Sequence, residues 1–462
     1  MPRGAAQKLF GTDGIRGEAG KFPLDENTVM LIGRSLVSNL ARELGRAPRV
    51  VIGRDTRESG PGIERALAGG AMAAGAQVIS AGVITTPGVA FVTRTEGFDA
   101  GVVISASHNP YRDNGIKVFS PSGKKLADEM ERRVEEDLAA GRHAGAGQRA
   151  SAEGPKAHDG YEDREAHYRE RYINYLAEDV GRGLSLDGLR VALDCANGAA
   201  SDLAPKLFRR IGAQVEVINA SPDGRNINEG CGSLHLEGLQ RVVVERRLDL
   251  GVAFDGDADR ALFVDSGGAL VDGDAVILAL ADYLKSRGLL AGDAVVATVM
   301  SNIGLEIALR ERSIELVRAQ VGDRYVLEEL LARGGRLGGE QSGHIIFPNI
   351  SLAGDGMITA LELLRVIRES GRPLSALASQ MTKFPQVLVN VRVSSKPPLE
   401  SLPEVKAEID RAEAELRGRG RLLVRYSGTE NLARVMIEGE DQAKIEEWAN
   451  HVSGVIRRAI GA

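Results

Sequence analysis

The chain has 462 residues, of which 43% are hydrophobic and 26% charged, with a formal net charge of −6. This composition is typical of a globular protein, and the length predicts about three or four domains. The acidic balance and the lack of a basic tract argue against a nucleic-acid partner. No apolar run approaches the roughly 20 residues of a membrane span, so no membrane partner is expected. Two cysteines form no disulfide framework, and the first residues lack a signal-peptide core, which predicts a cytoplasmic protein.

Short apolar strands alternate with helical stretches along most of the chain. Residues 27–44 have helical periodicity. Strands are predicted at 49–53, 77–79, 101–104 and 115–119, then at 189–194, 214–218 and 250–254, and then at 294–299, 314–318 and 345–347. This restarting rhythm predicts an α/β fold of three consecutive domains with mixed sheets.

The last 80 or so residues have a different pattern, which predicts a smaller α+β domain. Residues 387–395 alternate like an antiparallel strand, and a charged helix follows at 404–417. The Gly-, Ala- and Ser-rich stretch 139–160 is predicted to be a surface loop or linker. We place the domains at 1–165, 166–265, 266–380 and 381–462, each contributing a loop to a central cleft.

The run AGVVISASHNPYRDNGIKVF, residues 100–119, contains the most informative residue, Ser107. An apolar strand leads directly into a turn that carries this hydroxyl and the imidazole of His108. Ligands bind at such strand ends in open α/β sheets, although Ser, Asn and Pro also favour ordinary turns. A free serine is a poor nucleophile, so a catalytic role requires an activating base or a metal.

A second run, LDLGVAFDGDADRALFVD at 248–265, offers a metal site. Asp255, Asp257 and Asp259 follow another apolar strand, and carboxylates so close together repel one another unless a cation lies between them. Oxygen ligands suit Mg²⁺. An EF-hand is set aside because Arg260 and Ser266 occupy its Gly and Glu positions. A phosphatase loop with Asp255 as nucleophile remains open, although Asp259 stands where such loops normally have Thr or Val.

Two further motifs offer groups for phosphate and sugar. In FGTDGIRG, residues 10–17, the Arg16 guanidinium can fork onto phosphate oxygens. GGEQSGHIIF, residues 338–347, has Glu340, Ser342 and His344 at every second position. In an extended segment these side chains share one face and could bind sugar hydroxyls. The alternative interpretation of the motif is a polar loop edge.

Two glycine turns complete the set of candidate loops. RYSGTENLAR, residues 425–434, surrounds a glycine with hydroxyls and guanidiniums and predicts a phosphate nest made by Arg425, Ser427, Gly428, Thr429 and Arg434. VGDRYV, residues 321–326, is a Gly-Asp-Arg turn for which a plain turn is an equally good interpretation.

Taken together, these motifs resemble those of the α-D-phosphohexomutase superfamily almost from end to end. The resemblance implies that Ser107 is a phosphoserine and holds Mg²⁺ through its phosphate, together with the three aspartates. It implies that Glu340 and Ser342 contact the sugar, and that the glycine-turn nest binds the non-reacting phosphate. The implied catalytic set is Ser107, His108, Lys117, Arg16, Arg260 and His344, in which Lys117, His344 and His108 are the candidates for the general base.

The resemblance also implies the activity. Gln341, between Glu340 and Ser342, is typical of members that act on glucosamine phosphates. We therefore expect an enzyme that interconverts glucosamine 6-phosphate and glucosamine 1-phosphate in UDP-N-acetylglucosamine and cell-wall precursor synthesis. One Mg²⁺ per subunit and glucosamine 1,6-bisphosphate or glucose 1,6-bisphosphate as activator and intermediate are implied, and a homodimer is compatible. Activity on mannose or glucose phosphates, an aspartate-nucleophile phosphatase and a non-catalytic sugar-phosphate binder are the alternatives.

Overall fold

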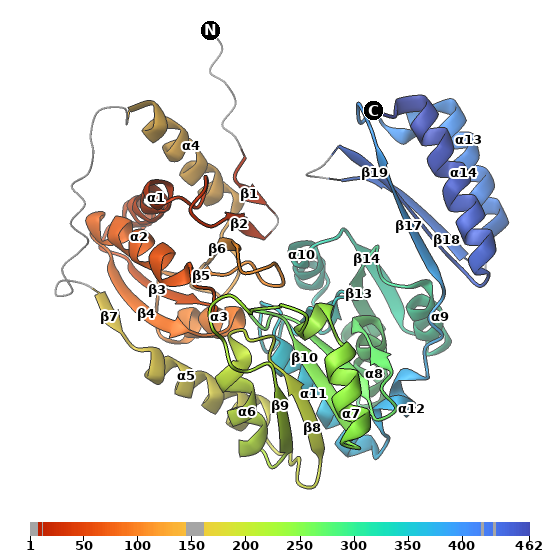
Figure 1. The fold of residues 1–462 in the computed structure, drawn as a ribbon, viewed down its shortest axis with the longest axis horizontal. Helices are drawn as coiled ribbons and strands as arrows, with labels where there is room; N and C mark the ends of the chain where they lie inside the picture. The colour runs from red at the N-terminus through yellow and green to blue at the C-terminus, as the bar shows by residue number, and fades with distance from the viewer. Residues whose placement is uncertain (1–7, 12, 145–160, 417–419, 428–430) are drawn as a thin grey trace. The chain divides into compact units, whose positions relative to one another are not determined.

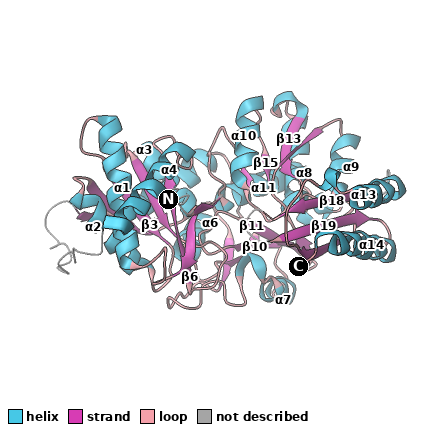
Figure 2. Ribbon diagram, turned by 90° about the horizontal axis from the view of Figure 1, so that it is seen from above, coloured by secondary structure: helices cyan, strands magenta, loops and turns pink. Residues whose placement is uncertain are grey.

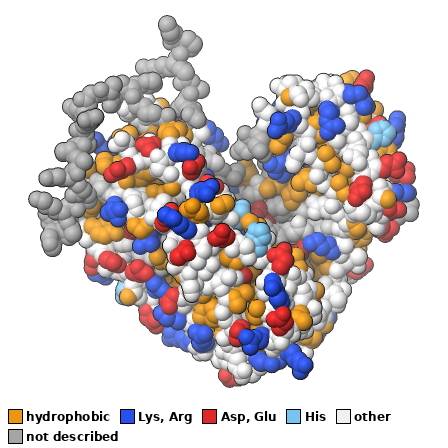
Figure 3. All heavy atoms as spheres, viewed as in Figure 1, with side chains coloured by type: hydrophobic (Ala, Val, Ile, Leu, Met, Phe, Trp, Pro, Cys, Tyr) orange, Lys and Arg blue, Asp and Glu red, His pale blue; other side chains and the backbone are white. Residues whose placement is uncertain are grey.

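The computed structural model describes residues 8–11, 13–144, 161–416, 420–427 and 431–462. They form two compact units (Figure 1). One unit holds the chain up to Met300 together with Leu316–Ser379, and the other holds Ser301–Glu315 together with Gln380–Ala462. No helix in the described ranges is long and apolar enough to cross a membrane. The face shown in Figure 3 intermixes basic and acidic side chains.

The first unit begins with a seven-stranded mixed sheet of order β1-β2-β6-β5-β3-β4-β7. β3 pairs in parallel with β4 and β5, whereas β6 is antiparallel to β5 and β2. Every residue of β5 is buried, as expected for a strand covered on both faces. The elements are β1 (Phe10–Gly11), β2 (Gly14–Glu18), α1 (Glu26–Leu44), β3 (Arg49–Arg54), α2 (Gly60–Ala73), β4 (Gln77–Val83), α3 (Thr86–Thr95), β5 (Ala100–Ile104), β6 (Asp113–Phe119), α4 (Asp128–Ala144), β7 (Tyr161–Asp163), α5 (Glu165–Asn174) and a π-helix (Tyr175–Val180).

Two smaller mixed sheets complete the first unit. The five-stranded sheet has the order β12-β11-β10-β8-β9, and the four-stranded sheet has the order β14-β13-β15-β16. β10 is parallel to β8 and antiparallel to β11, and β15 is parallel to β13 and antiparallel to β16. Their elements are β8 (Arg190–Asp194), α6 (Ala200–Arg210), β9 (Gln214–Ile218), α7 (Glu237–Glu245), β10 (Leu250–Phe254), β11 (Ala261–Asp265), β12 (Leu270–Val271), α8 (Gly273–Ser286), β13 (Ala294–Thr298), β14 (Glu315–Ala319), α10 (Asp323–Arg333), β15 (Gly338–Gly339), β16 (Ile345–Ile346), α11 (Gly356–Ser370) and α12 (Leu374–Ala378).

The second unit is built on an antiparallel sheet of order β17-β19-β18. Helices α13 and α14 pack side by side on it (Figures 1 and 2), and they enclose a core that includes Val435 and Val452. The buried Glu438 accepts hydrogen bonds from Asn302 and the Ile303 amide, which attaches α9 to this unit. The elements are α9 (Ile303–Glu311), β17 (Gln386–Arg392), α13 (Pro403–Leu416), β18 (Gly420–Tyr426), β19 (Leu432–Gly439) and α14 (Gln442–Ile460).

The three mixed sheets and the antiparallel sheet confirm the predicted fold class. The domain boundaries and the central cleft remain predictions. The loop predicted at 139–160 is wrong at its start, because α4 continues to Ala144. Met130, Val134 and Leu138 are buried one helical turn apart, and this spacing carries the helix onward. Residues 145–160 lie outside the described part of the chain.

Candidate active site

Ser107 lies in the loop after β5, at the carboxyl end of a strand that is parallel to β3. Its backbone has the left-handed φ of +51°, which is uncommon for a residue with a side chain, and the residue is buried. The Oγ atom donates a hydrogen bond to Asp255 Oδ2 at 2.5 Å and lies 3.3 Å from His108 Nδ1. The loop therefore presents this hydroxyl to the first aspartate of the predicted metal loop.

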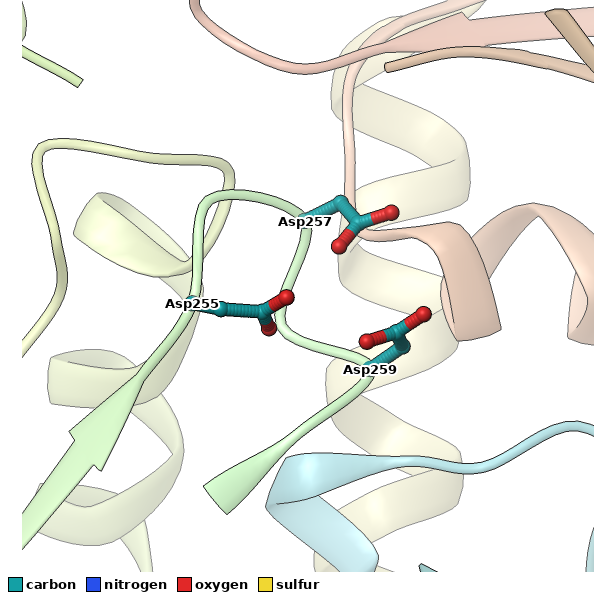
Figure 4. A group of neighbouring side chains, drawn as sticks. All are labelled: Asp255, Asp257 and Asp259. Atoms are coloured by element: carbon teal, nitrogen blue, oxygen red, sulfur yellow. The ribbon is translucent and has the colours of Figure 1, made fainter. Parts of the chain in front are cut away.

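The three aspartates project from the single loop between β10 and β11 (Figure 4). All three are buried, and one oxygen from each lies within 4.8 Å of the others. Burial and the neighbouring carboxylates of Asp259 and Asp257 raise the pKa of Asp255 well above its usual range. Asp257 Oδ1 and Asp259 Oδ1 are buried without a hydrogen-bond partner among the described residues. Buried carboxylate oxygens that lack a hydrogen bond fit a bound divalent cation.

A glycine allows the serine loop and the metal loop to approach each other closely. A Cβ atom at Gly256 would lie 2.5 Å from the carbonyl oxygen of Ser107. Any side chain there would push the loops apart, and the Ser107 hydroxyl would lose its contact with Asp255. Gly256 therefore brings the candidate nucleophile to the candidate metal site.

Two cationic side chains flank the aspartates. Lys117, on β6, places Nζ 3.0 Å from Asp257 Oδ2 and 3.4 Å from Asp259 Oδ2. Burial alone would lower the pKa of Lys117, but the carboxylates, chiefly of Asp13 and Asp257, outweigh it and raise this pKa well above its usual range. His344 places Nδ1 3.6 Å from Asp259 Oδ1. Burial likewise opposes the charge of His344, but Asp259 raises its pKa to about 9.

The other predicted catalytic residues belong to the same region of the first unit. Arg16 donates from Nη1 to Asn109 in the serine loop at 3.4 Å, and the Arg260 amide donates to Asp255 Oδ1 at 3.2 Å. Burial and the nearby guanidiniums of Arg260 and Arg16 lower the pKa of His108 to about 4. Groups that can neutralise negative charge or transfer a proton thus lie near Ser107.

The predicted sugar loop is a tight turn between β15 and β16, which corrects the extended conformation expected for 340–344. Two backbone hydrogen bonds close it: the Glu340 amide donates to the His344 carbonyl at 2.9 Å, and the Gly343 amide donates to the Glu340 carbonyl at 3.0 Å. Ser342 Oγ still donates to Glu340 Oε2 at 3.1 Å. Gln341 points elsewhere and donates to Asp274 Oδ2 at 3.2 Å.

The predicted phosphate nest lies in the second unit. Arg425 on β18 stands directly opposite Arg434 on β19. Burial and this like charge lower the pKa of Arg425. Cations directly opposite each other on neighbouring strands repel, so this arrangement favours an anion between them. Ser427 is buried, and its carbonyl accepts a hydrogen bond from Lys396 at 2.7 Å, whereas Gly428 and Thr429 lie outside the described residues.

Sequence reasoning missed the residues that hold the serine loop from behind. Arg57 donates to the Ser107 carbonyl at 2.9 Å and to the Asn109 carbonyl at 2.8 Å, and it is paired with the buried Asp55 at 2.9 Å. Asn228 also donates to the Ser107 carbonyl, at 2.9 Å. The only signal for these residues in the sequence was the run of charged residues at the end of β3. The sequence does not show that β3 lies next to β5, because this depends on the order of the strands in the sheet.

Family models match four consecutive parts of the chain. Phosphoglucomutase/phosphomannomutase domains I, II and III, each described as alpha/beta/alpha, match residues 7–144, 170–268 and 272–384. The C-terminal domain model of the same family matches residues 388–455. The two buried thiols, Cys195 and Cys231, fall within the second match and form no disulfide.

Full-length relatives and solved structures agree with this assignment. The chain is 51% identical over 99% of its length to the phosphoglucosamine mutase of Solibacter usitatus, covering 100% of that protein, and 50% identical over 98% of both chains to that of Koribacter versatilis. A phosphoglucomutase/phosphomannomutase family protein from Burkholderia thailandensis has a TM-score of 0.77 at 25% identity, with 98% of each chain covered. The chain therefore belongs to the phosphoglucomutase/phosphomannomutase family of the α-D-phosphohexomutase superfamily, and it is an enzyme.

Proposed function

We propose that this enzyme is a mutase that interconverts glucosamine 6-phosphate and glucosamine 1-phosphate through phospho-Ser107. The observation that carries the reaction type is the contact between the Ser107 hydroxyl and Asp255, within a set of three carboxylates in which two buried oxygens lack a hydrogen bond among the described residues. The full-length relatives named phosphoglucosamine mutase support the amino-sugar substrate. A cytoplasmic location, a homodimer and a role in cell-wall precursor synthesis accompany the proposal as predictions.

In the proposed reaction, the C1 hydroxyl oxygen of the sugar attacks the phosphoryl group carried on Ser107 Oγ. The bond from phosphorus to Oγ breaks, the bond to O1 forms, and the hydroxyl proton passes to a protein base while Oγ regains a proton. The bisphosphorylated sugar then turns over, and its 6-phosphoryl group returns to Oγ with the opposite proton movements. Arg57 and Asn228 hold the serine loop, and Arg16, Lys117 and Arg260 offset the negative charge that develops.

Asp255, Asp257 and Asp259, with the phosphoryl oxygens on Ser107, would hold one Mg²⁺. When bound, the ion neutralises charge on the transferring group. An Aspergillus fumigatus N-acetylphosphoglucosamine mutase has been solved in complex with GlcNAc-6P and magnesium, and its fold matches with a TM-score of 0.67 at 19% identity over 98% of this chain and 96% of that one. The same fungal enzyme type has been solved with glucose 1,6-bisphosphate, which supports a 1,6-bisphosphate as activator and intermediate.

Glu340 and Ser342 would bind the sugar, and the nest of Arg425, Ser427 and Arg434 would bind the phosphate that is not reacting. Three groups are candidates for the proton carrier. His108 contacts the Ser107 hydroxyl, whereas Lys117 and His344 contact Asp259.

The proposal is tested by the rates with three substrates. In the presence of Mg²⁺ and a 1,6-bisphosphate, kcat/KM for glucosamine 6-phosphate should exceed that for glucose 6-phosphate and mannose 6-phosphate. Coupled assays measure the rate at which each sugar 1-phosphate forms, and free phosphate is measured in parallel. A higher kcat/KM for glucose or mannose phosphate would establish the second candidate, a phosphoglucomutase or phosphomannomutase, and stoichiometric release of free phosphate would indicate a phosphatase.

Glu340→Gln should reduce kcat/KM for glucosamine 6-phosphate more than for glucose 6-phosphate. The Glu340 carboxylate can pair with the protonated 2-amino group, and a charge-assisted contact is worth roughly 1.5–3 kcal/mol. That corresponds to about 10- to 150-fold in discrimination. The glutamine can still accept from the Gly322 amide, which lies 3.1 Å from Glu340 Oε1, so the turn should persist.

Gln341→Met is the matched control for Glu340→Gln. Because Gln341 points toward Asp274, its loss should affect both sugars alike. An equal fall for both sugars in Glu340→Gln would limit Glu340 to contacts with the shared hydroxyls, and the amino-sugar preference would then arise elsewhere.

A further inference from the structure

A closed ring of alternating charges lies beside the metal loop, within the first unit. Each basic member is next to two acidic members. The successive distances are 3.1, 2.6, 2.7, 3.7, 3.6 and 3.4 Å around the ring Lys117–Asp13–Lys125–Asp323–His344–Asp259 and back to Lys117. Three members, Lys117, His344 and Asp259, already have proposed roles at the metal site. Asp13, Lys125 and Asp323 have none.

Lys125 and Asp323 connect the two halves of this ring. Lys125 lies in the loop between β6 and α4, and Asp323 is the first residue of α10. Lys125 Nζ lies 2.6 Å from Asp13 Oδ1 and 2.7 Å from Asp323. It therefore links Asp13, which contacts Lys117, to Asp323, which faces His344. Asp323 belongs to the glycine turn at 321–326, for which the sequence left a plain turn equally open.

The imidazole of His344 lies between the carboxylates of Asp259 and Asp323. Its Nδ1 faces Asp259, and its Nε2 faces Asp323 at 3.7 Å without a hydrogen bond within the described residues. One side of the ring is closed by Gly354, where a Cβ atom would lie 2.2 Å from Nε2. Another side borders a cavity of about 230 Å³ that Leu126 and Leu327 help to line. The cavity leaves room for the imidazole to rotate if the attraction of Asp323 is lost.

We propose that Lys125 and Asp323 are a positioning pair that holds His344 and, through Asp13, Lys117 in register with the metal loop. The proposal rests on the mutase function proposed above, because its kinetic effect requires that Lys117 and His344 act in phosphoryl transfer. The turn that carries Asp323 also holds the sugar loop through the Gly322 amide, so one turn aligns both the proton-carrying and the sugar-binding groups.

Asp323→Asn and Lys125→Met should each lower kcat about 10- to 100-fold while KM for the sugar phosphate changes by less than about twofold, because the reacting groups are displaced but the phosphate and sugar contacts remain. Lys125→Arg, which keeps the cation, should recover most of this loss. The double variant should be little worse than either single variant, since both changes break the same link.

Asp128→Asn is the matched control. Asp128 pairs with Arg324, the residue after Asp323, and this exposed pair also joins α4 to α10. If Asp323 only helps to join these elements, Asp128→Asn and Asp323→Asn should lower kcat equally. If Asp323 positions His344, Asp128→Asn should keep a kcat near that of the wild type. Thermal melting of each variant shows whether it is folded. An unchanged kcat in folded Asp323→Asn, or an equal loss in Asp128→Asn, would overturn the proposal.

A readout without turnover separates this proposal from the proposed function. In protein carrying ¹³C-labelled histidine, the His344 resonance, assigned among seven histidines with a His344→Gln variant, should shift in Asp323→Asn and stay in place in Asp128→Asn. An unshifted His344 signal overturns the positioning role even if the enzyme is a mutase. A shifted signal in a protein that converts no hexose phosphate refutes the proposed function instead.

Discussion

Ser107→Ala is expected to abolish mutase activity, with a loss of about 10⁴-fold or more, because the covalent carrier of the phosphoryl group is removed. Intact mass spectrometry of the wild-type protein should show a fraction heavier by one phosphoryl group, and peptide mapping should locate it at Ser107. The variant should lack this fraction. Steady-state assays with glucosamine 6-phosphate and a 1,6-bisphosphate measure the loss.

The variant should fold, so the loss can be assigned to chemistry. Alanine at position 107 meets the same left-handed backbone as serine, and the loop remains held by Arg57 and Asn228 through the carbonyl oxygen. Ser105→Ala is the matched control. Ser105 is buried two positions earlier, donates to Asp55 at 2.7 Å instead of facing Asp255, and accepts from the Ser107 amide at 2.9 Å. Its replacement therefore removes a contact of the serine loop but leaves the phosphoryl carrier, so this variant should keep the phosphorylated fraction. Wild-type turnover in Ser107→Ala would exclude the phosphoserine mechanism and favour the hypothesis of a phosphatase with Asp255 as nucleophile.

The sequence predicted the positions of the serine loop and the metal loop because each follows a strand that its composition already marks. The strands predicted at 101–104 and 250–254 are β5 and β10, and the serine and aspartates stand immediately beyond them. Side-chain chemistry then predicted that these two loops act together, since a serine that carries a phosphoryl group and a carboxylate cluster that holds Mg²⁺ are both suited to phosphoryl transfer.

The supporting contacts could not be predicted, because they join residues that only the tertiary fold brings together. Lys125 and Asp323 are 198 positions apart and pair through two loops that the sequence presents as ordinary turns. Arg57 reaches Ser107 because β3 lies next to β5, and this neighbour relation is not encoded in either strand alone. The turn at 340–344 was mistaken for an extended segment because alternation of side chains describes a strand and a tight turn equally over so few residues.

Removal of the divalent metal is the second change expected to have a very large effect. EDTA should abolish turnover of the wild-type enzyme, and added Mg²⁺ should restore it. Without a cation, the three buried carboxylates repel one another, and burial together with the charges of Asp259 and Asp257 raises the pKa of Asp255. The charge on the transferring phosphoryl group would also lack its counter-ion. Full activity in EDTA would show that the aspartates serve another purpose.

Asp257→Asn tests the same site in the protein itself. The change keeps the shape of the side chain, and its oxygen can still accept from Thr86, which donates to Asp257 at 2.6 Å, so the loop should persist. It removes one ligand charge. Loss of an outer-shell partner typically weakens metal binding 10- to 100-fold, so loss of a direct ligand charge should weaken it by more than about 100-fold.

Asp265→Asn is the charge-matched control for Asp257→Asn. Asp265 ends β11 and caps the next turn by accepting from the Gly267 and Ala269 amides, each at 2.9 Å. Its neutralisation alters the net charge equally but should leave metal affinity unchanged. Mn²⁺ titration followed by electron paramagnetic resonance measures the affinity of both variants independently of turnover. If Asp257→Asn binds Mn²⁺ as tightly as the wild type, Asp257 is not a metal ligand. If both variants bind Mn²⁺ equally weakly, the effect comes from net charge, because only Asp257 is proposed to bind the metal directly.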